Sequence, residues 1–260
     1  MEVRRFHRKR TRGVLATLTL VSLLLITAGP ARGHTSESDS LFQENTGDLG
    51  NHAVWTDPNW SGIPCGTQLG SIHYVLTHLV VFGSNSAYVT VGSQKLKTSN
   101  GDGTCNSVHE YFWARFYNQG FVMGEISSPT PPGTHDFALN QLTTGCATGI
   151  AWCWHIRIDG NTKHTTAGEV TDLALGLAFT LDTECNVHGS PAECQASGLI
   201  DTAHDLTIKR LNGQWEPWAG KDYECSDYAT KARAKWASAT SIKAGYNVTL
   251  SGAIQGDQCQ

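Results

Sequence analysis

The stretch from Ala151 to Asn161 reads A-W-C-W-H-I-R-I-D-G-N and indicates the fold class. Large apolar residues occupy its alternate positions: Trp152, Trp154, Ile156 and Ile158. Because successive side chains of a strand point to opposite faces, this alternation predicts a strand with one apolar and one polar face. The closing Asp-Gly-Asn predicts a tight turn. Two indoles and two isoleucines need a second layer to cover them, so the stretch predicts a strand of a β-sandwich.

The rest of the chain continues this pattern. Short runs of β-branched and aromatic residues are separated by Gly, Asn, Ser and Pro, and no long run with helical periodicity precedes the C-terminal part. The predicted strands are Ser71–Phe82, Ala87–Val91, Val108–Tyr117, Phe121–Ile126, His135–Leu142, Trp152–Asp159, Ala174–Glu184, Leu206–Leu211 and Tyr246–Ile254. This spacing predicts an all-β protein built as an antiparallel sandwich rather than from βαβ units.

The segment from Ser226 to Ser238 fits two patterns. Tyr228, Ala232 and Trp236 would share one face of a helix, whereas the basic residues at 231, 233 and 235 alternate as on an edge strand. We expect a short C-terminal helix here, with the edge strand as the alternative.

The first 33 residues predict a cleaved secretory signal peptide. Basic residues crowd positions 4 to 12, an apolar run extends from Val14 to Ile26, and Ala31-Arg32-Gly33 supplies small residues for a signal peptidase. The apolar run is shorter than the roughly 20 residues of a membrane-spanning helix. We therefore expect a secreted, extracellular protein that has no membrane attachment after cleavage.

The polar residues 34–51 predict a mobile leader, and residues 52–260 predict a single β-sandwich domain. Of the 19 basic and 23 acidic residues of the chain, seven and one lie in the signal segment, which leaves 12 and 22 and a net charge of −10. Such a charge repels phosphate backbones, so nucleic acid is not expected as a partner.

All eight cysteines follow the signal segment: Cys65, Cys105, Cys146, Cys153, Cys185, Cys194, Cys225 and Cys259. An even number in an exported chain predicts a disulfide-stapled fold. Pairing Cys146 with Cys153 and Cys185 with Cys194 would close short loops, and pairing Cys65 with Cys105 and Cys225 with Cys259 would fasten the two ends of the domain. A zinc site is the alternative, but no C-x-x-C pair occurs, so neither a metal ion nor another cofactor is expected.

The predicted strand Val108–Tyr117 carries aromatic residues on both faces. Phe112 and Phe116 lie on one face. The other face carries a row of aromatic and basic residues, namely Tyr111, Trp113, Arg115 and Tyr117. Since a strand needs only one face for the core, the second row either packs under a covering loop or lines an open concave surface. Such rows suit stacking on sugar rings or gripping an extended peptide.

Two weaker patterns suggest catalysis. Asp182 and Glu184 are two residues apart on a predicted strand, and paired carboxylates carry out glycoside hydrolysis, although acids on a solvated strand face are far commoner. Cleavage after Gly33 would make His34 the N-terminus, where an amine and two imidazoles can bind copper as in oxidative polysaccharide-cleaving enzymes. An incidental histidine is the plainer interpretation.

Several short motifs between residues 59 and 211 resemble the secreted glutamic peptidases (eqolisins). Asn59-Trp60-Ser61-Gly62 resembles their N-W-[AS]-G opening, and Y-F-W-A-R-F-Y at 111–117 resembles their Y-x-x-W-Y-E-x-Y strand. Pro132-Gly133 resembles their P-G-D turn, and F-T-L-D-T-E-C at 179–185 is similar to their A-E-W-I-V-E segment. The resemblance implies a concanavalin-like jelly roll with two seven-stranded antiparallel sheets.

The same resemblance implies a catalytic pair made of Gln94 and Glu184. The glutamate would act as a general base on a water molecule, and the glutamine amide would stabilise the oxyanion. The chain departs from the family in three respects: Gln94 lacks the glycine that follows in the family, Glu184 lies between Thr183 and Cys185, and Arg115 replaces an acid.

The sequence therefore predicts a secreted protein that binds an extracellular polymer, a carbohydrate or a peptide, without catalysis. The predicted ligand-binding residues are Tyr111, Trp113, Arg115 and Tyr117. The alternative is an acid-acting glutamic-type peptidase. The two hypotheses differ in one geometric point, which is whether Gln94 reaches Glu184.

Overall fold

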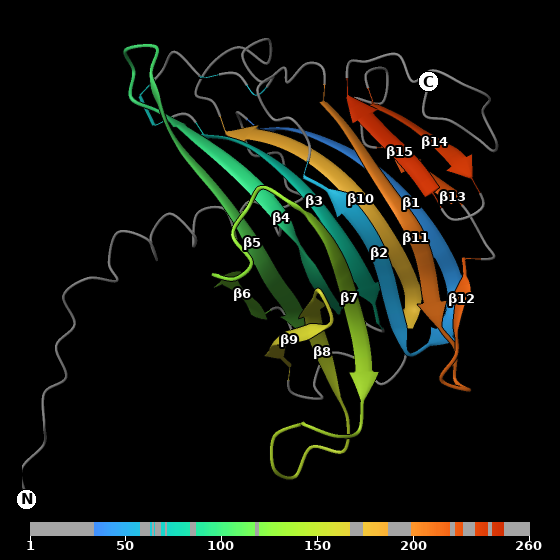
Figure 1. Cartoon of the computed structure of the whole chain (residues 1–260). Coiled ribbons are helices and arrows are strands. Elements are labelled where there is room, and N and C mark those ends of the chain that lie inside the picture. The colour runs from blue at the N-terminus through green and yellow to red at the C-terminus, as the bar shows by residue number, and fades with distance from the viewer. Residues whose placement is uncertain are drawn as a thin grey trace, which may run out of the picture.

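The computed structural model describes the backbone of residues 34–57, 63, 65, 69–70, 72–83, 87–117, 120–166, 174–186, 199–218, 222–225, 232–238 and 241–246. In these segments all the regular structure consists of strands, and every strand pairing is antiparallel (Figure 1). The described residues include no helix that is long and apolar enough to cross a membrane.

The strands form two sheets. Sheet A has the order β13-β1-β10-β3-β4-β5-β6. Its strands are β1 (His34–Asp48), β3 (Ile72–Phe82), β4 (Tyr88–Ser99), β5 (Cys105–Tyr117), β6 (Gly120–Ile126), β10 (Ala174–Asn186) and β13 (Asp222–Cys225). Sheet B has the order β14-β15-β11-β2-β7-β8-β9, with β12 paired to β11. Its strands are β2 (Gly50–Thr56), β7 (Thr134–Leu142), β8 (Cys153–Ile158), β9 (Asn161–Thr165), β11 (Leu199–Lys209), β12 (Trp215–Pro217), β14 (Ala232–Ser238) and β15 (Ser241–Tyr246).

The chain passes repeatedly between the two sheets. Strands β1 and β10 lie in sheet A, while the strands that follow them, β2 and β11, lie in sheet B. Strands β3 to β6 then return to sheet A, and β7 to β9 return to sheet B. This alternation is the winding of a jelly roll, so the predicted antiparallel β-sandwich is confirmed.

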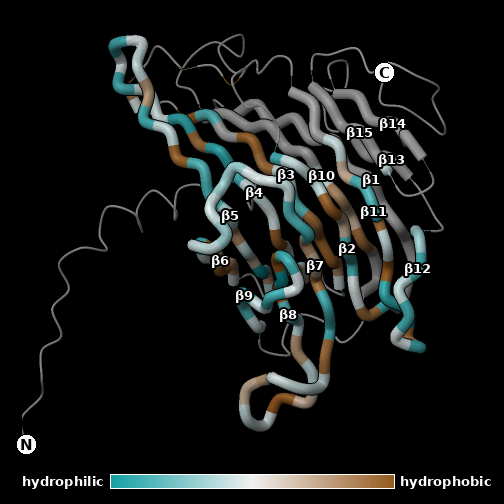
Figure 2. Tube along the Cα trace, in the orientation of Figure 1, coloured by the Kyte–Doolittle hydropathy of each residue, from teal (hydrophilic) through white to brown (hydrophobic). Residues whose placement is uncertain are grey.

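The core lies between the sheets and is rich in aromatic side chains. Trp154, Ile156 and Ile158 are all fully buried there, which confirms the apolar face predicted for β8. Trp55 of β2 stacks on Phe137 of β7, with ring centroids 3.6 Å apart and an angle of 8° between the planes. Apolar and polar residues alternate along the strands, as the core-facing and outward positions require (Figure 2).

A buried polar group also joins the sheets. The Asn51 side chain, on β2, donates hydrogen bonds from Nδ2 to the carbonyl oxygens of Val80 (2.9 Å) and Ala178 (3.1 Å) in sheet A. Because a buried amide is costly without partners, these bonds fix the relative position of the sheets.

Two of the predicted disulfides are confirmed. Cys65 bonds to Cys105, and Cys146 bonds to Cys153. The other predicted pairs, Cys185 with Cys194 and Cys225 with Cys259, involve side chains outside those that the structure describes and stay predictions.

The segment that was expected to be a mobile leader forms a strand instead. Residues 34–48 make β1, which pairs with β10 on one side and with β13 on the other. Hydrogen bonds of the sheet ladder order this strand through its backbone, and a polar composition does not reveal them. The signal segment 1–33 lies outside the described residues.

The expected C-terminal helix is also corrected. Residues 232–238 form β14, an edge strand of sheet B that pairs with β15. The alternating basic residues at 233 and 235 were thus the informative pattern, because charged residues are typical of sheet edges. Of the strand expected at Tyr246–Ile254, only Tyr246 is described, and it is the last residue of β15.

Candidate functional site

The row predicted to bind a ligand faces the inside of the sandwich. Tyr111 is fully buried in the core between the sheets, and Trp113 and Tyr117 pack against that core. The Trp113 indole stacks on His164 of β9, with ring centroids 3.5 Å apart. The open-surface interpretation is therefore wrong for Tyr111. Aromatic residues occupy both faces of β5 because both faces are packed.

The Tyr111 hydroxyl has a structural partner. It donates a hydrogen bond to Asp57 Oδ2 at 2.6 Å, and the same oxygen accepts one from the Gly133 amide at 3.1 Å. His109 Nε2 lies 3.6 Å from this carboxylate. Burial, followed by the bond to Asp57, raises the pKa of Tyr111 far above its usual value. The ring therefore stays neutral and anchors the end of the core.

The structure separates Gln94 from Glu184 in the sheet register. Gln94 pairs with Leu76, and Leu76 pairs with Asp182, so one row of sheet A leads from Gln94 to Asp182. Glu184 lies one row further along, opposite Tyr74. Strand β3 thus stands between the two residues of the predicted pair. The Glu184 side chain is outside those described, and the catalytic pair stays a prediction.

Gln94 has another acidic partner, which the sequence did not reveal. Gln94 and Glu110 are opposite each other on β4 and β5, and the Gln94 amide donates a hydrogen bond to the Glu110 carboxylate. Burial raises the pKa of Glu110, the bond from Gln94 opposes this, and the charge of Glu125 adds to it. The side chain of Gln94 is buried on this outer face of sheet A.

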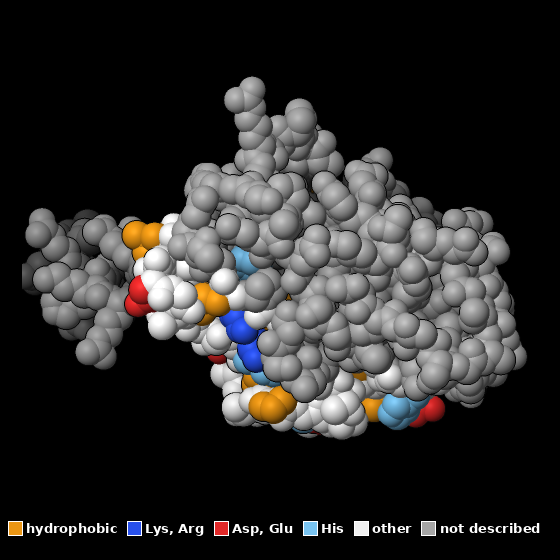
Figure 3. Space-filling model, turned by 90° about the horizontal axis from the view of Figure 1, so that it is seen from above, with side chains coloured by type: hydrophobic (Ala, Val, Ile, Leu, Met, Phe, Trp, Pro, Cys, Tyr) orange, Lys and Arg blue, Asp and Glu red, His pale blue; other side chains and the backbone are white. Residues whose placement is uncertain are grey.

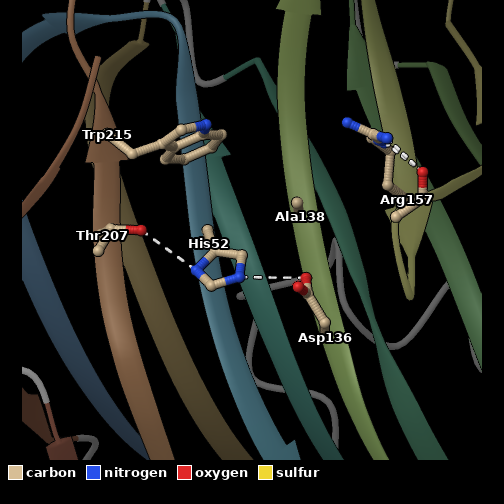
Figure 4. Close-up of a pocket in the computed structure, with 7 residues that line it drawn as sticks. His52, Asp136, Ala138, Arg157, Thr207 and Trp215 are labelled. Carbon is tan, nitrogen blue, oxygen red and sulfur yellow. Dashed lines mark hydrogen bonds and ion pairs between the residues drawn. The ribbon is translucent and has the colours of Figure 1, made fainter.

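A cavity of about 280 Å³ lies on the outer face of sheet B. Its lining residues come from five strands and one turn: His52, Asp136, Ala138, Arg157, Gly160, Thr207 and Trp215. The ladder places Thr207, His52, Ala138 and Arg157 side by side on β11, β2, β7 and β8. Because Ala138 is small, it forms a floor with His52 on one side and Arg157 on the other (Figure 4).

The Trp215 indole lies over β2 at the edge of this cavity. A Cβ atom at Gly50 would come within 2.8 Å of Trp215 Cη2, so the missing side chain of Gly50 makes room for the ring. The ring also meets His52 edge to face, with centroids 5.7 Å apart (Figure 4). Trp215 is nevertheless 40% exposed. The Trp215 indole is thus fixed by its neighbours and still exposes part of its aromatic surface to solvent.

His52 is surrounded by hydrogen-bond acceptors. Its Nε2 lies 3.1 Å from Asp136 Oδ1, and its Nδ1 lies 2.9 Å from the Asp205 carbonyl oxygen and 3.1 Å from Thr207 Oγ1. The Asp205 carbonyl reaches the ring because β11 has a bulge between His204 and Thr207, where Asp205 has φ of 56°. Both ring nitrogens can therefore donate at once, as an imidazolium does.

The charges of this site shift the ionisation of its groups. Burial opposes protonation of His52, but the hydrogen bond and charge of Asp136, together with Asp205, leave its pKa raised. The bond from His52 lowers the pKa of Asp136, and Arg157 contributes to the same shift. The two groups form an ion pair at weakly acidic pH.

The cavity residues could not be assembled from the sequence. Arg157 lies on the polar face of the stretch that indicates the fold, which was the one available signal. His52, Thr207 and Trp215 come from segments that carry no motif. In the view from above, Lys, Arg and His side chains lie at the surface beside hydrophobic ones (Figure 3).

One cluster of potential metal ligands does not fit a metal. Cys146, Cys153 and His155 have ligand atoms within 4.8 Å of one another. The two sulfur atoms form a disulfide, so they offer no thiolate to an ion.

No protein-family model and no curated protein matches the chain. Twenty chains of solved structures do match it. One is the crystal structure of the β-porphyranase BpGH16B from the human gut bacterium Bacteroides plebeius, with 11% sequence identity and a TM-score of 0.17. The alignment covers 60% of this chain and 57% of that one. A likeness at this level transfers neither a function nor a site to this chain.

Proposed function

We propose that this protein is secreted and binds a polysaccharide on the outer face of sheet B, without catalysing its cleavage. The observation that carries the proposal is the Trp215 indole, which is fixed over Gly50 and His52 yet 40% exposed beside a polar cavity. A sugar ring has an apolar face and a rim of hydroxyl groups. It matches an aromatic surface that adjoins hydrogen-bonding side chains.

The polar groups around the cavity suit the hydroxyl rim. Asp136 accepts hydrogen bonds, the Arg157 guanidinium donates them, and the Thr207 hydroxyl does both. These residues lie on different strands of one sheet, so their spacing is set by the ladder rather than by a loop. A site on rigid strands costs little ordering entropy when a ligand binds.

The described lining of the cavity does not contain the carboxylate pair of most glycoside hydrolases. Such enzymes place two carboxyl groups about 5 to 10 Å apart across the scissile bond. Among the described residues that line this cavity, Asp136 is the single carboxylate, and it is bonded to His52. The arrangement therefore supports binding rather than hydrolysis.

Affinity electrophoresis of the secreted protein in gels that contain neutral and acidic polysaccharides tests this proposal. We expect retardation by at least one polymer, and the Trp215→Ala variant should bind it about 30-fold more weakly, as for an aromatic hot spot. The matched control is Val122→Ala, because Val122 is exposed to the same degree (41%) on sheet A. Equal binding by the Trp215→Ala variant and the unchanged protein would refute the proposal.

A second candidate function, a glutamic-type peptidase, has one observation in its favour. The Gln94 amide is bonded to Glu110, whose pKa is raised by burial, on the face of sheet A that also carries residues 182 and 184. A Gln–Glu pair is chemically suited to activating a water molecule at acid pH, although the eqolisin resemblance implies Glu184 rather than Glu110 as the partner of Gln94. The same face is closed over Gln94, so a substrate would need access that the binding proposal does not require.

Digestion of an unfolded protein substrate at acid pH separates the two functions. We expect no digestion by the purified protein. Activity that persists through repurification and is lost in both the Glu110→Gln and the Glu184→Gln variants would favour the peptidase. Loss in only the Glu184→Gln variant would assign the catalytic carboxylate to Glu184.

A further inference from the structure

Two cations, one in the wall of the cavity and one beside it, are held by neutral oxygens. The Arg157 Nε and Nη2 atoms both donate to the carbonyl oxygen of Gly160, with Nε at 3.1 Å. Lys209 Nζ donates to Asn140 Oδ1 at 2.9 Å. Within the described part of the chain, neither cation forms an ion pair with a carboxylate. The neighbouring Arg210, by contrast, is paired with Asp48 and Glu216.

The two cations approach the same strand from opposite sides. Arg157 is the ladder neighbour of Ala138, so it flanks β7 from β8. Lys209 starts on β11, and its ammonium reaches Asn140 on β7 by crossing β2 at Gly50, where no side chain obstructs it. Burial, and then the charge of Arg157, lower the pKa of Lys209, which shows that the two charges act on each other.

Trp215 borders this pair of cations. It is the ladder partner of Lys209 between β12 and β11, and its indole covers Gly50. The carboxylate of the site, Asp136, lies toward the other end of the cavity and is bonded to His52. Arg157 therefore lies in the cavity wall and Lys209 beside the cavity, in the row of Asn140, whereas Asp136 lies on the opposite side of the Ala138 row.

We infer that the sugar unit bound here is anionic, with its carboxylate or sulfate group between Arg157 and Lys209 and its ring on Trp215. This inference rests on the proposed function. The Gly160 carbonyl holds the guanidinium in place and leaves Nη1 and the outer edge of Nη2 for two parallel hydrogen bonds to an oxyanion. The ammonium of Lys209 adds a point charge from the facing side. Asp136 would repel a ligand that entered in the reverse orientation.

Polygalacturonate and its fully methyl-esterified form provide a matched pair of probes, because esterification removes the charge and keeps the backbone. Isothermal titration of the full secreted protein at low salt should show at least about tenfold tighter binding to the acid polymer. The Arg157→Gln and Lys209→Gln variants should each lose most of that preference. Lys95→Gln, which removes a cation from sheet A, is the matched control and should keep it. A sulfated galactan and its desulfated form repeat the comparison for sulfate.

The outcomes separate this inference from the proposed function. Equal affinity for the charged and uncharged forms of both polymers, with binding still lost in Trp215→Ala, would refute the anionic ligand and leave polysaccharide binding intact. Binding to no polymer at all would refute both. A preference for the charged forms that both cation variants retain would also refute the assignment to Arg157 and Lys209. A preference confined to one polymer pair would identify the anion as carboxylate or sulfate.

Discussion

The outer faces of the two sheets differ in what they expose. The outer face of sheet A carries a second apolar cluster, made of Ile72, Leu76, Leu96, Phe112 and Ala114, all buried. The outer face of sheet B carries His52, Asp136, Arg157 and Thr207 around an open cavity. Both sheets also share one core on their inner faces. Among the described residues, the outer face of sheet A is apolar and buried at this cluster, whereas the outer face of sheet B is polar and open at the cavity.

This difference explains why a row of aromatic residues was misleading. A strand that is packed on both sides carries apolar residues on both faces, and β5 does so from Tyr111 to Ala114 because this part of sheet A is covered on both sides. In β8 the core residues alternate with Cys153, His155 and Arg157, and this second, more polar face contains the cavity residue Arg157. In this protein the solvated polar face of sheet B, rather than the aromatic strand, is the better guide to a binding surface.

The largest expected effect tests the packed side. Phe112 is 2% exposed on the outer face of sheet A, so Phe112→Ala should lower the free energy of unfolding by about 3 to 5 kcal/mol. Trp215→Ala on sheet B removes a larger but half-solvated ring and should cost about 1 kcal/mol. Urea denaturation of the two variants measures both values.

Phe112→Leu is the control, because it keeps most of the apolar volume and should retain most of the stability. A loss below about 1 kcal/mol in Phe112→Ala would contradict the comparison. It would mean that the outer face of sheet A is open, and the aromatic strand would again become a candidate binding surface.

An intermediate effect is expected at Gly50, which lies beneath the Trp215 indole on the outer face of sheet B. A Cβ atom there would lie 2.8 Å from Trp215 Cη2 and 2.9 Å from the Leu139 carbonyl oxygen. Gly50→Ala should therefore cost about 1 to 3 kcal/mol of stability and displace the indole, so polysaccharide binding should fall as in Trp215→Ala. Denaturation and affinity electrophoresis measure the two effects.

A double-mutant cycle isolates the contact with the indole. Without the Trp215 ring, Gly50→Ala should cost less than it does in the unchanged protein, and the binding should not fall further. Strictly additive losses would show that Gly50 acts through the Leu139 backbone alone. The position of the Trp215 indole would then not depend on the missing side chain of Gly50.

The sequence predicted the fold well because the relevant signals are local. Alternation identified β8, and the boundaries of β3, β6 and β7 were placed within one residue. Strands β4 and β5 are longer than predicted because the turn Asn100–Thr104 is tight: Asn100 N donates to Thr104 O at 3.0 Å, and Gly101 and Gly103 have positive φ. The sequence shows that this turn is rich in glycine, but it does not show the register in which the turn pairs β4 with β5.

The site was not predictable because its residues come together through pairings between distant strands, which local signals do not reveal. The cavity unites β2, β7, β8, β11 and β12, and two of the pairings that build it, β11 with β2 and β2 with β7, join strands that are far apart in the chain. Gln94 and Glu110 face each other across the short Asn100–Thr104 turn, whereas the approach of His52 and Trp215 depends on which distant strands become neighbours. Tyr111 and Trp215 are both aromatic residues on strands, and the fold alone decides that one is buried and the other exposed.

The smallest expected effect concerns the His52–Asp136 ion pair on the outer face of sheet B. The raised pKa of His52 means that its stabilising contribution is present below the ordinary value of 6.5 and disappears as the pH rises through the raised value. The lowered pKa of Asp136 means that its contribution is present above 3.8 and disappears as the pH falls through the lowered value. The pair therefore stabilises the fold most between these limits, near pH 5.

His52→Gln removes the titrating ring and keeps a hydrogen-bonding side chain. Because the Asp136 side chain is 46% exposed, solvent screens the pair, and we expect the variant to be less stable by no more than about 1 kcal/mol at pH 5. The difference should shrink toward zero by pH 8. Urea denaturation at several pH values measures it, with His204→Gln as the control, since the His204–Asp205 pair is more exposed on both sides. A difference that stayed constant, or grew with pH, would show that His52 acts in the cavity as a neutral ring, and Asp136 would then carry its full charge there.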